Sequence, residues 1–341
     1  MLTPMPLRLD WINSIIRLLR GGKMNIKDLV REDIRDLQPY EPHLYENVIK
    51  LDANENPYPF PEELKERIFA AVNKETFSRY PDPTADGLRR EIAGYTGVEY
   101  PNIIAGNGSD ELIQLILQTF AGPGKRVLIP VPTFAMYHIH SRITGSTPVH
   151  LPMDEAYRVP VEAIIKEMAN PGTGVTFLVT PNNPTGSTIP IDTIEYILAR
   201  STGLVAVDEA YIEFGGRTAV PLLAKYNNLV ILRTFSKVAL AGLRIGYLLA
   251  GREVVDELMK VKQPYNTDAF SQLAATVALR NWPLITDQVE KIVAERGRIM
   301  NEMAGMPGLT VYPSEANFIL FKPQQPAGEV HQQLLDAGIL V

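Results

Sequence analysis

Three apolar runs of the 341-residue chain end in side chains that could do chemistry. VTFLVT is followed by PNNPTG (residues 181–186), LVAV by DEAY (residues 208–211), and LVILRT by Lys237. Ligands bind outside the carboxyl ends of the strands in an open α/β sheet, so we expect these segments to converge on one cleft.

Each segment also has an ordinary structural interpretation. PNNPTG is typical of a turn, Asp208 could cap a helix or pair with an arginine, and Lys237 could reach solvent through its long stem. The occurrence of all three together favours a functional site.

A fourth segment, GNGSDELIQLILQTF (residues 106–120), predicts a phosphate site at a helix start. Gly106 and Gly108 allow close backbone approach, and we expect Ser109 to be the N-cap. A third glycine and a GxxxxGK[ST] loop are both missing, which argues against a nucleotide site. Together these features describe a site for pyridoxal phosphate. Such a site needs a lysine for an imine, a carboxylate for a ring cation, amide and hydroxyl donors, and a phosphate site.

Short apolar runs alternate with longer amphipathic ones from about residue 50, which predicts an α/β fold with a mostly parallel central sheet flanked by helices. The predicted strands are Asn102–Ala105, Val127–Val131, Val175–Thr180, Leu204–Val207, Leu229–Arg233 and Ile245–Ala250. The predicted helices are Glu62–Val72, Leu88–Tyr95, Asp110–Phe120, Val161–Met168, Val254–Val261 and Asp287–Met303.

The composition narrows the function classes. Hydrophobic residues make up 45% and charged residues 21%, as in an ordinary globular protein, and the net charge of -6 argues against a nucleic-acid binder. The chain has no cysteine, which excludes disulfides and thiolate sites and fits a reducing cytoplasm. His138 and His140 lack a nearby third ligand in the sequence, so no metal site is expected.

Four regions are expected along the chain. We interpret residues 1–24 as a disordered or artefactual leader, with a packing helix or a membrane-surface helix as alternatives, because this segment has helical apolar spacing but is too short to span a bilayer. Residues 25–58 are expected to form an N-terminal arm and part of a small domain, residues 59–275 a large cofactor-binding domain, and residues 276–341 the C-terminal part of a smaller α+β domain.

A series of motifs, from about Asn25 to the end, resembles those of histidinol-phosphate aminotransferases, which belong to the class II pyridoxal-phosphate-dependent aminotransferases of fold type I. They are LDANENP (51–57), RYPDP (79–83), GNGSDEL (106–112), PNNPTG (181–186), VDEAYIEF (207–214), RTFSK (233–237), AGLRIGY (241–247) and PSEANFIL (313–320).

This resemblance implies roles for the residues that could act on the cofactor. Lys237 would bind pyridoxal 5'-phosphate covalently, and Asp208 would hold the pyridine nitrogen protonated. Asn183 and Tyr211 would donate to the phenolic oxygen, and Phe134 would stack on the ring, although Phe134 could equally be a core residue.

The resemblance also implies a phosphate site, a partner and a substrate site. The phosphate would be bound by Gly108, Ser109, Asp110, Ser236 and Arg244, with Tyr80 reaching it from the other subunit of a homodimer. Tyr40, Asn54 and Glu55 match positions that line the substrate entrance, although the arm that carries them could equally be structural.

Two departures from the family pattern affect these expectations. Arg244 follows Lys237 by seven residues, one fewer than in most relatives, which could displace the arginine by up to about 3.5 Å. The chain also stops at Val341, where relatives continue with two arginines that grip the substrates. From this we expect a truncated form of a transaminase, with an incomplete small domain.

The leading interpretation is amino transfer between L-histidinol phosphate and 2-oxoglutarate in histidine biosynthesis. An aromatic amino-acid aminotransferase and a threonine-phosphate decarboxylase are the alternatives within the same scaffold. A regulator that senses pyridoxal phosphate is a remote one, because the leader is too short to hold a DNA-binding domain.

Overall fold

The computed structural model describes residues 25–39 and 45–341. Residues 25–39 belong to a short unit of their own, with two 3-10 helices, η1 (Ile26–Leu29) and η2 (Glu32–Ile34). Residues 45–341 belong to a second compact unit. The expected leader, residues 1–24, and Tyr40 lie outside the described residues.

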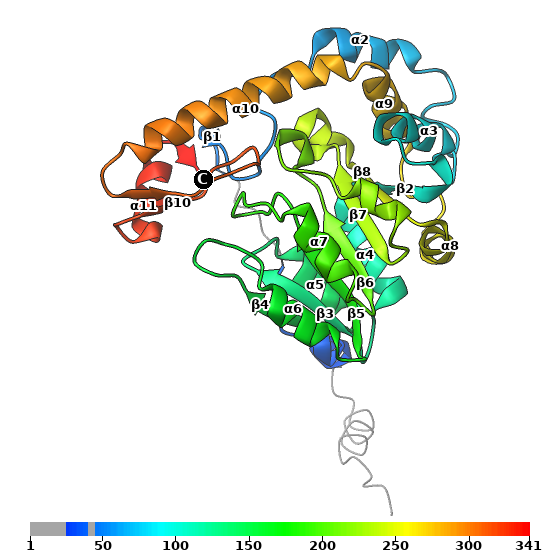
Figure 1. Ribbon diagram of the computed structural model, residues 1–341. Coiled ribbons are helices and arrows are strands. Elements are labelled where there is room, and N and C mark those ends of the chain that lie inside the picture. The colour runs from blue at the N-terminus through cyan, green and yellow to red at the C-terminus, as the bar shows by residue number, and fades with distance from the viewer. Residues whose placement is uncertain (1–24, 40–44) are drawn as a thin grey trace, which may run out of the picture. The chain divides into compact units, whose positions relative to one another are not determined.

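A seven-stranded sheet forms the centre of the second unit, in the order β2-β8-β7-β6-β5-β3-β4 (Figure 1). Only β8 runs antiparallel to its neighbours, which confirms the predicted mostly parallel α/β fold. The strands are β2 (Ile103–Asn107), β3 (Arg126–Val131), β4 (Thr147–Pro152), β5 (Thr173–Val179), β6 (Leu204–Asp208), β7 (Leu229–Thr234) and β8 (Ile245–Ala250).

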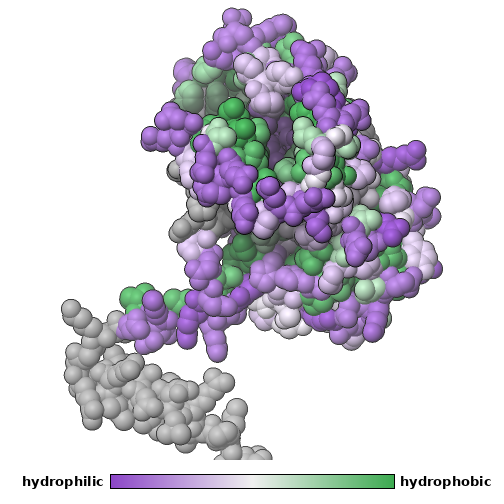
Figure 2. Space-filling model, turned by 90° about the vertical axis from the view of Figure 1, so that its left-hand side faces the viewer, coloured by the Kyte–Doolittle hydropathy of each residue, from purple (hydrophilic) through white to green (hydrophobic). Residues whose placement is uncertain are grey.

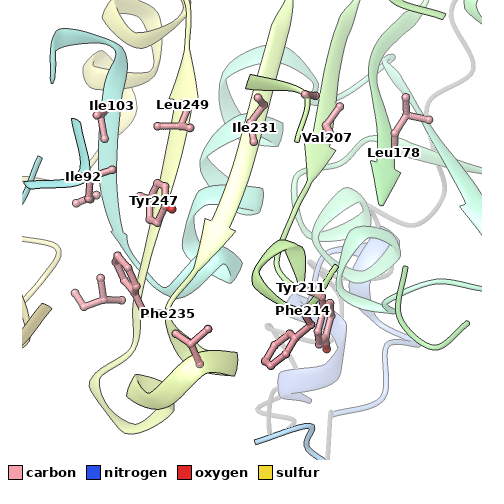
Figure 3. Packing of buried hydrophobic residues seen from close by; sticks show 14 of the residues in the cluster. Ile92, Ile103, Leu178, Val207, Tyr211, Phe214, Ile231, Phe235, Tyr247 and Leu249 are labelled. Carbon is pink, nitrogen blue, oxygen red and sulfur yellow. The ribbon is translucent and has the colours of Figure 1, made fainter. Parts of the chain in front are cut away.

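The sheet is buried on both faces, which explains the nearly continuous apolar sequences of its central strands. On one face, a row of side chains paired in register crosses five strands (Figure 3). The row consists of Ile103, Leu249, Ile231, Val207 and Leu178. Helices that pack on this face are α2 (Glu62–Ala71), α3 (Asp86–Thr96), α6 (Val161–Met168), α7 (Ile191–Leu198), α9 (Ala269–Arg280) and α10 (Pro283–Ala304).

The opposite face carries a second core, formed with α4 (Gly108–Phe120), α5 (Met136–Ile143) and α8 (Arg252–Val261). Asp208 and Tyr137 lie on this side, since residues of β6 alternate between the two faces. Asp208 and Tyr137 therefore contribute to the predicted site from the α4 and α5 side of the sheet.

The C-terminal segment lies at one end of the long helix α10 (Figure 1). It contains β9 (Leu309–Val311) paired with β10 (Phe321–Pro323), and α11 (Ala327–Asp336). Strand β1 (Ile49–Lys50) of the predicted arm pairs in parallel with β11 (Ile339–Leu340). Residues far apart in the sequence thus meet in one small sheet.

All six predicted strands and all six predicted helices occur, with ends shifted by a few residues at most. Strand β4 was not predicted, because its sequence TPVHLP contains two prolines and its residues are mostly not buried. Helices α5 (eight residues), α7 (eight residues) and α9 were not predicted either.

The surface in the space-filling view is largely hydrophilic, with smaller hydrophobic areas between (Figure 2). Over residues 25–39 and 45–341, no helix combines the length and the apolar character needed to cross a bilayer.

Candidate active site

A cavity of about 110 Å³ lies at the carboxyl ends of β5, β6 and β7. All three predicted catalytic residues, Lys237, Asp208 and Tyr211, line this cavity. Six of the predicted cofactor-binding residues line it too: Ser109, Asp110, Phe134, Asn183, Ser236 and Arg244. The segments that follow the three apolar runs therefore do converge.

Asp208 ends strand β6 and is buried. One carboxylate oxygen accepts a hydrogen bond from the Tyr137 hydroxyl at 2.7 Å, and the other accepts from the Ala210 N–H at 2.9 Å. Burial raises the pKa of Asp208 to about 6, against the opposing effect of these two hydrogen bonds. A positively charged group in the cavity would favour the ionised carboxylate.

Tyr137 is a site residue that sequence reasoning missed. Its ring is fully buried, stacks on Phe177 at 4.5 Å between centroids, and meets the edge of Phe134 at 5.8 Å. The only signal in the sequence is its position three residues after Phe134, and a helix was not predicted there.

Lys237 lies in η6 (Ser236–Leu240), a π-helical turn that follows β7. Its Nζ donates to the Ala53 carbonyl oxygen at 3.0 Å and lies 5.6 Å from the centroid of the Tyr211 ring. Burial lowers the pKa of Lys237, although the charges of Asp110 and Glu55 oppose this. A lower pKa makes the neutral, nucleophilic amine easier to form.

Tyr211 is buried and accepts a hydrogen bond from Asn54 Nδ2 at 3.2 Å. Burial raises its pKa to about 12, while hydrogen bonds with Asn54 and Asn183 oppose the rise. The hydroxyl therefore stays protonated at neutral pH and can donate.

The start of helix α4 lies beside the end of strand β8. The helix begins at Gly108 and its N-cap is Asn107, so the expectation that Ser109 is the N-cap was wrong. Gly108 has φ +77, a conformation that favours glycine. A Cβ on Gly246 would lie 2.7 Å from the Ser109 nitrogen, so glycine at 246 lets the helix start approach the strand.

Arg244 reaches this helix start despite its short spacing from Lys237. Two features compensate for the one residue fewer between Lys237 and Arg244. They are a tight 3-10 turn, η7 (Ala241–Leu243), and a left-handed conformation at Arg244, with φ 53. Its guanidinium lies 3.3 Å from Asp110 Oδ2 and 3.5 Å from Ser236 Oγ. A Cβ on Gly108 would lie only 2.9 Å from Arg244 Nη2, so the helix start and the guanidinium enclose one cradle.

The other predicted site residues lie around the cavity or away from it. Glu55 is mostly exposed and pairs with Lys50 at 3.1 Å. Tyr80 is 83% exposed, stacks on Tyr265 at 4.7 Å, and does not line the cavity.

The cavity fits pyridoxal phosphate in three respects. Asp208 is a buried carboxylate suited to a protonated ring nitrogen, Lys237 is a buried amine, and the cradle at Gly108 has the N–H groups and cation that bind a phosphate. Among the residues placed in the structure, no group of three or more histidines and carboxylates could hold a metal ion.

Comparison with known proteins agrees with this geometry. Residues 46–341 match the family described as aminotransferase class I and II. Histidinol-phosphate aminotransferase 1 of Carboxydothermus hydrogenoformans is 45% identical over 319 residues, covering 93% of this chain and 91% of that protein. The histidinol-phosphate aminotransferase of Thermoanaerobacter pseudethanolicus is 43% identical, covering 93% of this chain and 90% of that protein.

Among solved structures, the histidinol-phosphate aminotransferase of Sinorhizobium meliloti in complex with pyridoxal-5'-phosphate is similar, with a TM-score of 0.83 and 26% identity. The match covers 92% of this chain and 88% of that one. The chain therefore belongs to the class I and II aminotransferases and, within them, to the histidinol-phosphate aminotransferase family.

Proposed function

We propose that the protein transfers an amino group between L-histidinol phosphate and 2-oxoglutarate, giving imidazole acetol phosphate and L-glutamate, in histidine biosynthesis. The observation that carries the proposal is the meeting of Lys237, Asp208 and Tyr211 in one cavity of a chain 45% identical to a histidinol-phosphate aminotransferase. The cofactor is pyridoxal 5'-phosphate.

When bound, the cofactor supplies an electron-withdrawing pyridine ring that stabilises negative charge at the substrate's α carbon. Asp208 would hold a proton on the ring nitrogen, which keeps the ring cationic. Tyr137 and the Ala210 N–H hold both carboxylate oxygens in place for this task. Because the carboxylate is buried, its attraction for a cation is screened little by water.

Lys237 would hold the cofactor between turnovers and move a proton at the substrate's α carbon during turnover. Its lowered pKa supports this role, since a base must be neutral to accept a proton. The Ala53 carbonyl, 3.0 Å from Nζ, fixes the direction of the amine.

The remaining cavity residues would position the cofactor. Tyr211 and Asn183 would donate to its phenolic oxygen, and Phe134 would stack on its ring. The backbone of Gly108, Ser109 and Asp110, with Ser236 and Arg244, would bind its phosphate, for which the cradle at the start of α4 gives support. Asn54 and Glu55 would line the way in for substrate.

A substrate panel tests the proposed reaction. The purified protein, loaded with cofactor, is incubated with 2-oxoglutarate and either L-histidinol phosphate or L-phenylalanine, and L-glutamate is measured. A parallel reaction with L-threonine phosphate is followed for carbon dioxide. We expect the highest kcat/KM with L-histidinol phosphate, whereas a higher value with phenylalanine, or carbon dioxide without glutamate, would contradict the proposal.

The protein would act as a homodimer in which Tyr80 binds the cofactor phosphate of the other subunit. Support comes from three exposed aromatic residues between positions 69 and 80: Phe69 (60% exposed), Phe77 (75%) and Tyr80 (83%). Phe69 and Phe77 each contact Phe270, with centroids 6.1 Å apart. Exposed apolar patches of this kind often mark contacts between proteins.

Subunit complementation tests the role of Tyr80. Tyr80→Ala and Lys237→Ala proteins are each nearly inactive if both residues serve the site. Mixed dimers would rebuild one intact site, so mixing should restore about a quarter of wild-type activity. No recovery after subunit exchange would contradict a role for Tyr80 across the interface.

Two further proposals concern organisation and location. Residues 25–58 would form an N-terminal arm and part of the small domain, residues 276–341 its C-terminal part, and residues 59–275 the large domain. The pairing of β1 with β11 supports a shared small domain for residues 49–50 and 339–340. The absence of cysteine from the sequence supports a cytoplasmic location.

A further inference from the structure

The turn Ser314–Phe318, which we name the SEANF turn, closes on itself. Ser314 Oγ donates to the Phe318 carbonyl at 2.6 Å and accepts from the Ala316 N–H at 3.1 Å. Ala316 is fully buried at its centre. These bonds make the turn a defined local structure although it lies outside the helices and strands.

The SEANF turn is fixed to both segments that carry the proposed donors to the cofactor's phenolic oxygen. The Glu315 N–H donates to the Gly186 carbonyl at 2.9 Å. Gly186 lies three residues after Asn183 in the sequence. Arg296 of α10 donates to the Ala316 carbonyl at 2.8 Å and to the Phe214 carbonyl at 3.0 Å. Phe214 lies three residues after Tyr211 in the sequence. The turn therefore holds one position relative to the cavity wall.

Asn317 extends this connection toward Tyr211. Its Nδ2 donates to the Asn54 carbonyl at 2.9 Å, and Asn54 Nδ2 donates to the Tyr211 hydroxyl at 3.2 Å. Asn317 Oδ1 is buried and has no hydrogen-bond partner within the described part of the chain. Asn54 is therefore the group to which the Asn317 amide is bonded.

The adjacent residue contacts Tyr211 directly. The Phe318 ring meets the Tyr211 ring edge-on, with centroids 5.2 Å apart and planes at 87°. Asn54 has φ 54, a conformation that needs support from its surroundings in any residue other than glycine. The bond from Asn317 to its carbonyl supplies such support.

The direction of these bonds matters for the hydroxyl. A phenol has one proton to donate, so a hydroxyl that accepts from Asn54 keeps its own proton for another acceptor. Accepting a hydrogen bond also polarises the O–H group and makes it a stronger donor. Asn54, held by Asn317, thus prepares Tyr211 to donate into the cavity.

We propose that Asn317 is a positioning residue that acts through Asn54 to orient the Tyr211 hydroxyl toward the cofactor's phenolic oxygen. The inference rests on the proposed role of Tyr211 at the cofactor. It extends the set of residues that serve the reaction to the SEANF turn.

The test is a pH titration of the absorbance of the cofactor-loaded protein without substrate. The absorbance of the bound cofactor changes when the cofactor loses a proton. A hydrogen bond to the cofactor's phenolic oxygen favours the negatively charged form of that oxygen. Losing this bond therefore raises the pH at which half of the absorbance change has occurred, which we call the midpoint. We expect Asn317→Ala and Asn54→Gly each to raise the midpoint by about half a unit, and Tyr211→Phe to raise it further. Because Asn317 acts through Asn54, the double variant should shift no more than Asn54→Gly alone.

The matched control is Glu315→Ala, in the same turn. Its half-exposed side chain contacts Arg296 only at 4.0 Å, and its backbone N–H is kept. Its midpoint should equal that of the wild type. Glycine at position 54 can adopt the positive φ of Asn54, and Asn54→Gly leaves the SEANF turn intact. The effect of Asn54 on Tyr211 can therefore be tested even if Asn317→Ala does not fold. The other titratable groups that line the cavity are unchanged in every variant: Asp110, Tyr137, Asp208, Lys237 and Arg244.

Unchanged midpoints in Asn317→Ala and Asn54→Gly, with a raised midpoint in Tyr211→Phe, would overturn the inference and leave the role of Tyr211 standing. Additive shifts in the double variant would overturn the route through Asn54. An unchanged midpoint in Tyr211→Phe would overturn the inference together with the assignment of Tyr211. None of these results depends on the substrate, so they are separate from the substrate panel.

Discussion

The Tyr137 hydroxyl lies 2.7 Å from a carboxylate oxygen of Asp208, and both side chains are buried. Helix α5 supplies the tyrosine and strand β6 the aspartate. The hydrogen bond favours the ionised carboxylate and opposes the effect of burial on its pKa. Tyr137 therefore helps Asp208 to stay ionised, which its proposed role beside a ring cation requires.

Replacing Tyr137 with phenylalanine removes this donor and keeps the packing against Phe177 and Phe134. A hydrogen bond to a charged group contributes about 1.5–3 kcal/mol, so we expect kcat/KM to fall by about 10-fold or more. Steady-state kinetics with L-histidinol phosphate would measure the effect. Tyr196→Phe is the matched control because Tyr196 is partly exposed on α7, and equal activity of the two variants would argue against the assigned role.

Replacing Asp208 with asparagine should have opposite effects on activity and stability. Activity should fall by about 100-fold or more, because the ring nitrogen loses its charged partner. The fold should tolerate the change, since an amide can accept from the Ala210 N–H and donate to the Tyr137 oxygen.

The stability effect should depend on pH. Burial raises the pKa of Asp208 from 3.8 to about 6, so its stabilising contribution is complete below pH 3.8 and is lost as pH rises through 6. This rise in the pKa of Asp208 corresponds to about 3 kcal/mol at high pH. In urea unfolding of cofactor-free protein, Asp208→Asn should be more stable than wild type at pH 8, with a smaller gain at pH 5. A constant difference across this range would disprove the sign or the origin of the shift.

The α/β fold could be predicted from the sequence because the central strands are buried on both faces and are therefore strongly apolar. Lys237 and Asp208 both line the cavity, because Asp208 ends strand β6 and Lys237 lies in the turn that follows β7. Tyr137 could not be predicted, because it lies on an eight-residue helix with three polar residues in its middle. The contacts of Asn54 with Tyr211 and of Lys237 with Ala53 span 157 and 184 residues, and no local pattern indicates them.

The conformation of Arg244 is a second feature that could not be predicted from the sequence. The short spacing from Lys237 suggested a displaced arginine, but a left-handed residue and a tight turn keep the guanidinium near Ser236 and Asp110. Non-glycine residues seldom adopt this conformation, so sequence rules would not place it there.

The buried ion pair between Arg233 and Glu209 should be important for stability. Arg233 donates twice to one Glu209 oxygen, at 2.8 and 3.0 Å, and Glu209 has no exposed surface. Arg233→Met leaves a buried carboxylate without its cation, so we expect a cost of about 3–5 kcal/mol in urea unfolding. Arg298→Met breaks exposed pairs on α10, which water screens, so it should change the urea midpoint far less than Arg233→Met. The prediction fails if both variants unfold at the same urea concentration.

Gly246 should be required for the phosphate cradle. An alanine there would place a methyl group 2.7 Å from the Ser109 nitrogen and 2.8 Å from the Gly108 carbonyl carbon, so the helix start must move. We expect Gly246→Ala to weaken cofactor binding by about 10-fold or more, measured by fluorescence titration. Gly94→Ala, in helix α3 with open space around it, is the control and should bind like the wild type. Equal affinities would show that the helix start is not used.

The central claim is that Lys237 holds the cofactor and that the protein exchanges amino groups with L-histidinol phosphate. The most direct measurement is the absorbance of purified, cofactor-loaded protein before and after L-histidinol phosphate is added without 2-oxoglutarate. Wild type and Lys225→Ala, which removes a surface lysine paired with Glu195, should show the lysine-bound chromophore and its loss on adding substrate. Lys237→Ala should show neither. A Lys237→Ala protein that keeps the chromophore and still converts L-histidinol phosphate would contradict the account.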